Sequence, residues 1–231
     1  MITQEHADRI KSLELKTTAD GSLTLFVPGL QEHYHSVHGA LQESEHVFNK
    51  AGLNAAHQQF APPINILEIG FGTGLNAVLT LAEARKTNLA LAYDTVEAFP
   101  LPWQLLEQVQ ANYPAELQPI SGVVHNCAWN QPLPVYSGIC FRKWQGRLQE
   151  LELTPQHYQV VYFDAFAPEK QPELWNEDIF RKIRAAMQPK GALVTYCAKG
   201  SVKRAMRAAG FEVEALPGPP GKREMTRAIC P

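Results

Sequence analysis

The sequence lacks several features, and each absence narrows the roles it can have. No apolar run approaches the roughly 20 residues needed to cross a bilayer, so no membrane span is expected. The first eight residues are polar and acidic, unlike a signal sequence. Only four cysteines are present and none forms a C-x-x-C pair, which favours free thiols in a reducing cytosol. They are Cys127, Cys140, Cys197 and Cys230. We therefore expect a cytoplasmic protein.

An overall positive charge is also absent, because the 231 residues carry a formal net charge of −2. The charge is nevertheless uneven along the chain. From Arg181 to the end, eleven Lys and Arg residues stand against three Glu, a net +8, whereas the first 180 residues carry −10. Such asymmetry indicates a basic face for a polyanion on an acidic body. Solvated helix faces without any partner are the alternative.

Metal-binding patterns are absent as well. Four histidines gather near the N-terminus: His33, His35, His38 and His46. Zinc sites, however, carry paired Cys or His ligands on two arms, and this sequence has no second arm. We expect no metal, and interpret these histidines as substrate contacts or loop residues.

The composition is that of a globular α/β protein, since 45% hydrophobic and 19% charged residues can bury one substantial core. Residues 11–27 predict a hairpin, because apolar and polar residues alternate on both sides of a turn at Asp20-Gly21. The apolar spacing over 39–51 predicts a helix. We expect residues 1–60 to form a cap, part of the same globule as a main domain at 61–231.

The stretch Glu68–Asn76 (E-I-G-F-G-T-G-L-N) is the centre of the main domain. An apolar run at 64–67 predicts a buried strand before it, and good helix formers at 77–84 follow it. Glycines at alternate positions let the backbone turn sharply and leave no Cβ between the main chain and a ligand. The free N–H groups of the following helix then face that ligand.

The spacing of the glycines limits which ligands the loop can be expected to bind. Dinucleotide folds use G-x-G-x-x-G to hold a pyrophosphate, whereas this pattern is G-x-G-x-G with an acidic residue two positions before it. S-adenosylmethionine has no phosphate, and its amino-acid end and cationic sulfonium suit a carboxylate at the strand tip. A structural tight turn is the alternative. The predicted cofactor-binding residues in this stretch are Glu68, Gly70, Phe71, Gly72, Gly74 and Asn76.

A second strand is predicted at 89–96, and Glu97 follows it, 23 residues after Gly74. In nucleotide-binding sheets an acidic residue at this strand tip accepts hydrogen bonds from ribose hydroxyls. We therefore assign Glu97 to the cofactor ribose. A solvated loop glutamate is the alternative.

The remaining segments continue to alternate between helix and strand. Helices are predicted at 102–112, 148–151, 174–187 and, with Ser201 as a cap, 202–209; strands are predicted at 138–144, 160–163, 192–197, 211–216 and 225–230. Residues 113–137, rich in proline and polar residues, predict an excursion over the sheet edge. This layout predicts the Rossmann-like class I S-adenosylmethionine-dependent methyltransferase fold, with a mostly parallel seven-stranded sheet.

The strand predicted at 160–163 ends in Asp164-Ala165-Phe166-Ala167-Pro168. Its tip lies beside the first strand's tip in a doubly wound sheet, so Asp164 should face the reactive end of the cofactor. We predict that Asp164 is the catalytic residue, aligning an amine substrate and contacting the cofactor. Phe166 is predicted to stack on the base that bears the amine. A helix N-cap and ordinary core packing are the respective alternatives.

Four stretches, spanning nearly the whole chain, resemble the methyltransferase part of the bacterial tRNA 5-methylaminomethyl-2-thiouridine biosynthesis family, MnmC. They are Tyr34-His35-Ser36 with Glu43–Phe48, Gly70–Asn76, Asp164–Pro168 with Trp175 and Phe180, and Gly221–Met225. The resemblance implies methyl transfer from S-adenosylmethionine to the primary amine of 5-aminomethyl-(2-thio)uridine at the tRNA wobble position. It also implies that Asp164 is the catalytic aspartate.

A tRNA substrate requires phosphate contacts, which give salt-dependent affinity without reading sequence. The candidates are Lys199, Lys203, Arg204, Arg207, Lys222 and Arg223. Tyr34, His35 and Ser36 are further candidates for substrate contact. Selectivity would come from a splayed anticodon base stacked on an aromatic ring.

The sequence departs from the family pattern at two positions. Ala165 stands where the family commonly has Gly, and Arg147 stands where many members have an acidic residue that contacts adenine. The larger bifunctional form also carries a flavin-dependent oxidase domain, which 231 residues are too few to hold. We expect a separate oxidase, or other wobble-uridine modification enzymes, as partners.

Two other classes of function share parts of this pattern. A polyamine-synthase-like aminopropyltransferase or a small-amine N-methyltransferase would have the same acidic-glycine motif and an aspartate at the fourth strand tip. The C-terminal charge excess argues for a polyanion instead. A non-catalytic cofactor-binding module is disfavoured by the intact Asp164 and glycines.

Overall fold

The computed structural model describes residues 12–231, and the predictions for residues 1–8 and for residue 11 lie outside them. The chain forms an eight-stranded sheet in the order β10-β11-β9-β8-β4-β5-β7-β6. Its strands are β4 (Ile64–Ile69), β5 (Leu91–Glu97), β6 (Leu133–Tyr136), β7 (Ile139–Gln145), β8 (Tyr158–Phe163), β9 (Met187–Thr195), β10 (Glu212–Pro217) and β11 (Glu224–Ile229). The five central strands are parallel, and β6, β10 and β11 run antiparallel to their neighbours.

The sheet has one strand more than the seven expected, because residues 113–137 are more regular than their composition suggested. They form α6 (Gln118–Asn126) and then β6, which pairs with β7 at the edge of the sheet. Pro134 lacks a backbone N–H, which an edge strand tolerates because its outer side needs no donor. A turn at Gly138, with φ +71°, connects the two strands.

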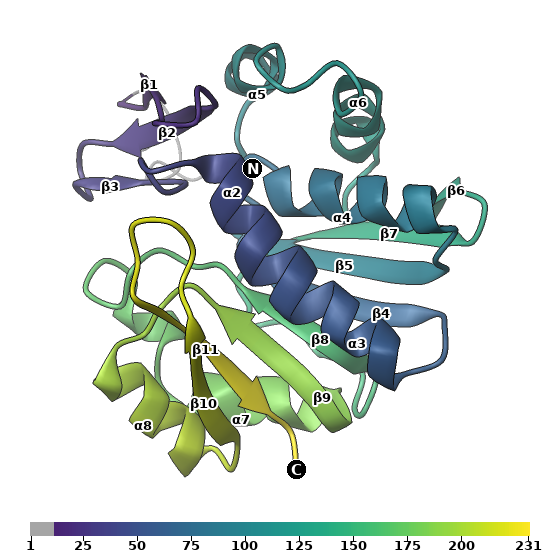
Figure 1. Ribbon diagram of the computed structural model, residues 1–231, viewed down its shortest axis with the longest axis vertical. Coiled ribbons are helices and arrows are strands. Elements are labelled where there is room, and N and C mark those ends of the chain that lie inside the picture. Colours follow the sequence, from purple (N-terminus) through teal and green to yellow (C-terminus); the bar gives the residue numbers. More distant parts are fainter. Residues whose placement is uncertain (1–11) are drawn as a thin grey trace.

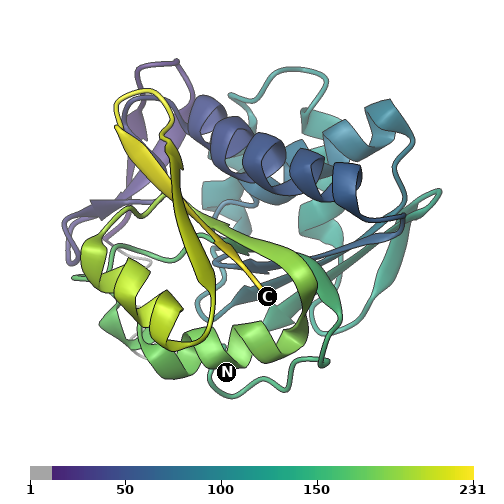
Figure 2. The same ribbon diagram turned by 60° about the horizontal axis from the view of Figure 1, so that its bottom comes forward.

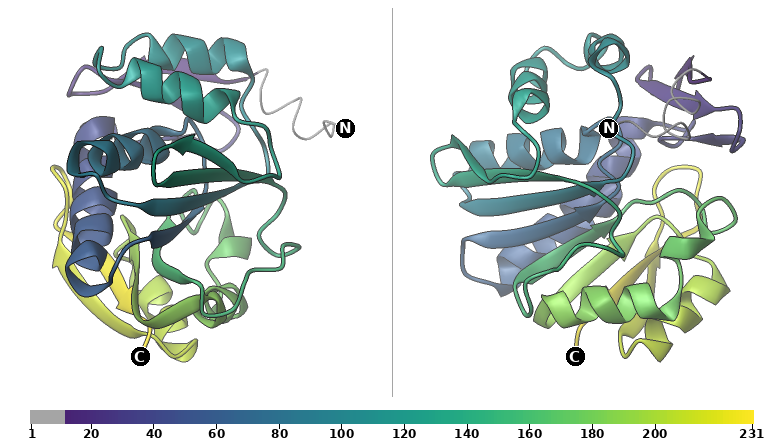
Figure 3. Two further views of the ribbon diagram at one scale, coloured as in Figure 1. Left: turned by 90° about the vertical axis from the view of Figure 1, so that its right-hand side faces the viewer. Right: turned by 180° about the vertical axis from the view of Figure 1, so that it is seen from behind.

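Helices cover both faces of the sheet, as Figures 1 and 2 show. One face carries a continuous helix built from α2 (Ala40–Ser44), the π-helix η1 (Glu45–Asn54) and α3 (Ala55–Gln59), together with α4 (Leu75–Thr87), α5 (Trp103–Gln110) and α6. The other face carries α7 (Glu177–Ala186) and α8 (Gly200–Ala208). Figure 3 shows these layers from the side and from behind.

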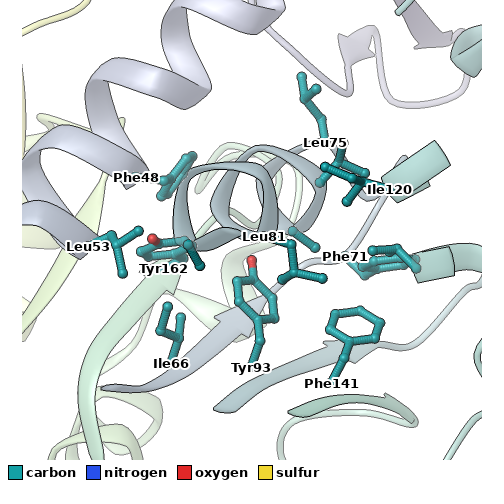
Figure 4. Packing of buried hydrophobic residues seen from close by; sticks show 14 of the residues in the cluster. Phe48, Leu53, Ile66, Phe71, Leu75, Leu81, Tyr93, Ile120, Phe141 and Tyr162 are labelled. Carbon is teal, nitrogen blue, oxygen red and sulfur yellow. The ribbon is translucent and has the colours of Figure 1, made fainter. Parts of the chain in front are cut away.

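Strand alternation decides which side chains meet which layer. Ile64 and Ile66 of β4 belong to the core under α4, whereas Leu67 and Ile69 belong to the core under α7. Figure 4 shows the first core, where Tyr93 and Tyr162 rise from the sheet toward α4. Glu68 follows Ile66 by two residues and Asp164 follows Tyr162 by two residues, so the same alternation directs both acidic side chains toward α4.

The N-terminal cap is a small antiparallel sheet of β1 (Glu14–Thr17), β2 (Leu23–Val27) and β3 (Glu32–His33). The predicted hairpin is confirmed over its described residues, and β3 adds a third strand. The helix predicted at 39–51 is also confirmed, although it continues to Gln59. The division of the chain into 1–60 and 61–231 stays a prediction.

Several predicted helix boundaries are wrong. Residues 148–150 form a turn rather than a helix, and the helix predicted from Leu174 begins at Glu177 because the Asn176 side chain caps it, accepting from Ile179 N at 3.1 Å. A 3₁₀ turn, η2 (Pro172–Leu174), precedes it. Lys199, not Ser201, occupies the N-cap position of α8. No helix within residues 12–231 has the length and apolarity to traverse a bilayer.

Candidate functional site

A cavity of about 310 Å³ lies at the carboxyl ends of β4, β5 and β8. The strand tips contribute Gly70, Gly72, Glu97 and Asp164 to its lining. The cap contributes residues 32–38, and Glu43 of α2 and Lys222 of the β10–β11 loop complete the lining from opposite ends of the chain. The topology thus brings most of the predicted site residues into one cavity.

Two glycines of the loop, Gly70 and Gly72, border this cavity, whereas Gly74 packs against His125 and Phe71 and is not part of the lining. All three glycines of the motif have positive φ, +96° at Gly70, +52° at Gly72 and +76° at Gly74. A Cβ at Gly70 would lie 2.5 Å from the backbone oxygen of Asp164, so only glycine lets β4 and β8 approach this closely. Helix α4 begins directly after Gly74 without any side-chain cap.

Glu97 is held by the backbone on both of its carboxylate oxygens. Oε2 accepts a hydrogen bond from Gly72 N at 3.0 Å, and Oε1 accepts one from Phe99 N at 2.8 Å. The carboxylate therefore lies against the glycine loop, inside the cavity, where the sequence placed a ribose acceptor.

Asp164 lines the cavity, and the side chain of Asn76 in α4 binds its carboxylate. Asn76 Nδ2 donates to Asp164 Oδ2 at 2.8 Å and to Glu68 Oε1 at 3.1 Å. Burial, with a contribution from the charge of Glu43, raises the pKa of Asp164 to about 7, while Asn76 and Lys222 act in the opposite direction. Glu68 is fully buried beneath Asn76 and is not among the residues that line the cavity.

Aromatic side chains from the cap and from β8 meet across the cavity. The rings of Tyr34 and Phe166 lie edge to face with centroids 5.0 Å apart. Trp175 Nε1 donates to the backbone oxygen of Phe166 at 2.7 Å, which fixes the backbone that carries the ring. Both rings line the cavity, at the place where the sequence predicted contact with a base.

An ion pair that the sequence did not indicate joins the cap to the β10–β11 loop. Lys222 Nζ donates to Glu43 Oε1 at 2.6 Å, and Ser36 N donates to Glu43 Oε2 at 3.0 Å. The Lys222 ammonium also lies 4.2 Å from the centroid of the Tyr196 ring. Glu43 belongs to one of the four stretches that resemble the MnmC family. Apart from that resemblance, the only sequence feature that could have pointed to Glu43 is its place as an acidic residue in the first turn of a predicted helix.

The predicted substrate contact His35 is bound within the protein at both ring nitrogens. Its Nδ1 lies 3.3 Å from Thr24 Oγ1 and its Nε2 lies 3.0 Å from Thr73 Oγ1. Burial lowers the pKa of His35 to about 4, so the ring is neutral and ties the cap to the glycine loop. Among residues 12–231, no three His, Cys, Asp or Glu side chains are placed to hold a metal ion.

Phe71 and Arg147 line the cavity differently from each other. The Phe71 ring packs into the core against His125, Trp129 and Phe141, and Figure 4 shows the contact with Phe141. The contribution of Phe71 to the cavity is therefore made by its backbone. Arg147 places its guanidinium 5.3 Å from the centroid of the Phe99 ring, and both residues line the cavity.

The basic residues divide into paired and exposed groups. Lys199 pairs with Glu169, and Lys203 pairs with Glu224 at 3.1 Å. Arg204, Arg207 and Arg223 are exposed. Lys199, Lys222 and Arg223 line a second, more open cavity that shares Ala167, Tyr196 and Lys222 with the first. Three of the predicted phosphate contacts therefore lie beside the main cavity, whereas Lys203, Arg204 and Arg207 line neither cavity.

Comparison with known proteins identifies the class. The sequence pattern of a family described as S-adenosyl-L-methionine-dependent methyltransferase matches residues 104–231. Because this covers more than half of the chain, and because the glycine loop and the cavity lie where this fold binds its ligand, the chain belongs to that family.

Relatives narrow the class further. The chain is similar to the tRNA 5-methylaminomethyl-2-thiouridine biosynthesis bifunctional protein MnmC of Magnetococcus marinus, with 35% identity over 85% of this chain and 31% of that protein. The protein of the same name from Ralstonia nicotianae is 32% identical over 90% of this chain and 33% of its own length. The chain thus spans about a third of these relatives. The predicted family resemblance is confirmed.

Solved structures confirm the predicted fold. The crystal structure of MnmC2 from Aquifex aeolicus matches with a TM-score of 0.77 and 27% identity, over 94% of this chain and 70% of that one. Spermidine synthase from Thermotoga maritima matches with a TM-score of 0.60 over 95% of this chain and 69% of that one. At 13% identity, the second likeness shows the fold alone.

Proposed function

We propose that this chain methylates the amino group of 5-aminomethyl-(2-thio)uridine at the wobble position of tRNA, with S-adenosylmethionine as the donor. The observation that carries the proposal is the position of Asp164, a buried carboxylate beside the glycine loop in a cavity that also holds an aromatic pair. The similarity to the MnmC proteins supports the choice of substrate.

The residues present fit the cofactor. Gly70 and Gly72 border the cavity next to the start of α4, where N–H groups without a side-chain cap can meet a carboxylate. Glu97 offers acceptors for ribose hydroxyls. When bound, S-adenosylmethionine would supply an electrophilic methyl group on a sulfonium.

The substrate base fits between the cap and β8. The Tyr34 and Phe166 rings offer a stacking surface for a splayed base. Asp164 then lies where it can accept hydrogen bonds from the amine and orient its lone pair. Most of the acceleration in such a displacement comes from alignment at near-attack distance. The amine attacks in its neutral form, and Asp164 takes up the proton released as the new C–N bond forms, directly or through water.

The basic residues beside the cavity and on α8 suit the tRNA backbone. Arg204 and Arg223 present charge to solvent, and Lys199, Lys203 and Lys222 add charge that is partly neutralised by carboxylates. We assign these residues to phosphate contacts, and place the activity in the cytoplasm with its tRNA. A flavin-dependent oxidase or another wobble-uridine modification enzyme would supply the free amine.

The test is nucleoside mass analysis of tRNA from a strain that lacks the protein. We expect 5-aminomethyl nucleosides to accumulate, and purified protein to transfer labelled methyl groups to that tRNA but not to tRNA from the parent strain. Putrescine and spermidine serve as the competing acceptors. Methyl or aminopropyl transfer to these amines, with none to tRNA, would reject the proposal.

A further inference from the structure

Asn76 connects two carboxyl groups that belong to different strands. Its Nδ2 donates to Asp164 Oδ2 at 2.8 Å and to Glu68 Oε1 at 3.1 Å. An amide nitrogen carries two N–H donors, so this single group can satisfy both acceptors at once. Glu68 is fully buried and Asn76 is 4% exposed, so water does not compete for the bond between them, whereas the bond to Asp164 is partly buried at the cavity wall.

The Asp164 carboxylate faces charged and titratable groups from every element packed around it. They are Glu43 of α2, Glu68 of β4, Tyr93 of β5, Tyr196 after β9 and Lys222 of the β10–β11 loop. The Lys222 ammonium is already bonded to Glu43, and Tyr196 Oη donates to Ala165 O at 2.8 Å. The Asn76 amide is therefore the group whose hydrogen bond is directed at the carboxylate itself.

We propose that Asn76 is the positioning residue for Asp164: anchored on Glu68, its amide holds the carboxylate in the orientation in which it meets the substrate amine. The inference rests on the proposed function, because the role of Asp164 is taken from it. Asn76 acts through Asp164 and not on the reacting atoms.

Burial favours the neutral carboxylic acid at this anchor. Glu68 pairs with Thr95 in the β4–β5 ladder, and Tyr93 lies two residues earlier on the same face, so both hydroxyls lie on the side of the sheet that carries the Glu68 carboxyl group. Burial and the charge of Asp164 raise the pKa of Glu68 to about 8, although hydrogen bonds from Thr95, Asn76 and Tyr93 act in the opposite direction.

The direct test is a carboxyl-carbon NMR titration of Asp164 in protein labelled at aspartate, with the signal assigned by Asp164→Asn. The hydrogen bond from Asn76 stabilises the ionised form, so its loss in Asn76→Ala should raise the pKa of Asp164 by about one pH unit. The matched control is Thr80→Val, one turn further along α4. It removes a buried hydrogen bond, from Thr80 Oγ1 to Asn49 Oδ1 at 3.0 Å, and should not move the titration.

The pH profile of kcat/KM gives the functional readout. Asp164 must be ionised to accept the proton, so the acid limb of the Asn76→Ala profile should move upward by about one pH unit and kcat should fall roughly 10- to 100-fold. The ionisation of the substrate amine is common to all variants. Glu68→Gln mimics the neutral anchor and should leave the acid limb in place, whereas Glu68→Ala should move it as Asn76→Ala does.

The proposal is overturned if Asp164 titrates in Asn76→Ala as it does in Thr80→Val, or if Glu68→Gln moves the limb as far as Glu68→Ala. Should Asn76→Ala fail to fold, Asn76→Ser replaces it, since a hydroxyl has one donor and cannot serve both carboxyl groups. A wild-type protein that never methylates tRNA would reject the proposed function. The NMR titration needs no substrate, and would still decide whether Asn76 holds Asp164.

Discussion

The cavity has two walls of different construction. One wall consists of the tips of β4, β5 and β8, where backbone N–H groups hold Glu97 and the Asn76 amide holds Asp164. The other consists of the cap and the β10–β11 loop, joined by side chains such as Glu43 and Lys222 that lie 179 residues apart in the sequence. The strand-tip wall is therefore fixed by the sheet, whereas the second wall depends on individual contacts between distant segments.

This difference predicts how substitutions in the two walls behave. Changes in the strand-tip wall should damage the cofactor site or the chemistry, because nothing there can move without moving the sheet. Changes in the second wall should weaken substrate binding and leave the cofactor site intact. Four substitutions test this division, from the largest expected effect to the smallest.

Asp164→Asn should cause the largest loss. The amide keeps the shape of the side chain but cannot take up a proton, so we expect methyl transfer to fall by a factor of about 10² to 10⁴. Single-turnover transfer of labelled methyl to tRNA measures this. Cofactor affinity, measured by calorimetry, should change by only a few-fold, and full activity in this variant would refute the assigned role.

Gly70→Ala should disrupt the strand-tip wall itself. The alanine Cβ would meet the Asp164 backbone oxygen at 2.5 Å, in a backbone conformation at φ +96° that side chains rarely adopt. We expect the free energy of unfolding to fall by about 1–3 kcal/mol, together with loss of cofactor binding. Denaturant titration and calorimetry test both, and Gly122→Ala, where a Cβ meets nothing within 4 Å, is the control.

Glu43→Gln should loosen the second wall and reach the strand-tip wall only through the charge that Asp164 senses. The amide keeps an acceptor for Ser36 N but removes the ion pair with Lys222, a half-buried pair whose loss should lower stability by about 1 kcal/mol or less. We expect KM for tRNA to rise several-fold with cofactor affinity unchanged. The charge of Glu43 raises the pKa of Asp164, so its removal should move the acid limb of kcat/KM to lower pH. A shift to higher pH would contradict the assignment.

Arg204→Ala should have the smallest effect. The side chain is exposed in the middle of α8, and a single phosphate contact contributes about one unit to the slope of log affinity against log salt. We expect weaker tRNA binding with a slope reduced by about one. Lys86 is exposed at the C-terminal end of α4, away from the glycine loop at the start of that helix. Lys86→Ala is therefore the control that should leave the slope unchanged.

The two walls also differ in how far the sequence could predict them. The strands at 64–67, 89–96 and 160–163 can be predicted because each segment is mostly apolar and is followed by an acidic residue. Their tips then follow from the rule that parallel strands end at one edge of the sheet. The fold and the position of Asp164 could therefore be predicted.

The second wall could not be predicted in the same way, because local patterns carry no information about contacts between residues such as Glu43 and Lys222. Helix α6 was missed for a local reason. Its sequence Q-P-I-S-G-V-V-H-N combines proline, glycine and β-branched residues, which are weak helix formers, and the buried Ile120 and Val124 compensate through packing. The extension of the cap helix to Gln59 likewise depends on packing, since Gly52 lies against Tyr162.

The two backbone hydrogen bonds on Glu97 have a consequence for the energetics of recognition. A free glutamate loses rotamer entropy worth up to about 2 kcal/mol when a partner immobilises it. Here the backbone amides of Gly72 and Phe99 fix the rotamer of Glu97 before a sugar binds. A ribose diol would therefore bind to a Glu97 carboxylate that is already ordered. Because the Gly72 amide belongs to the glycine loop, a shift of the bound sugar would also shift that loop.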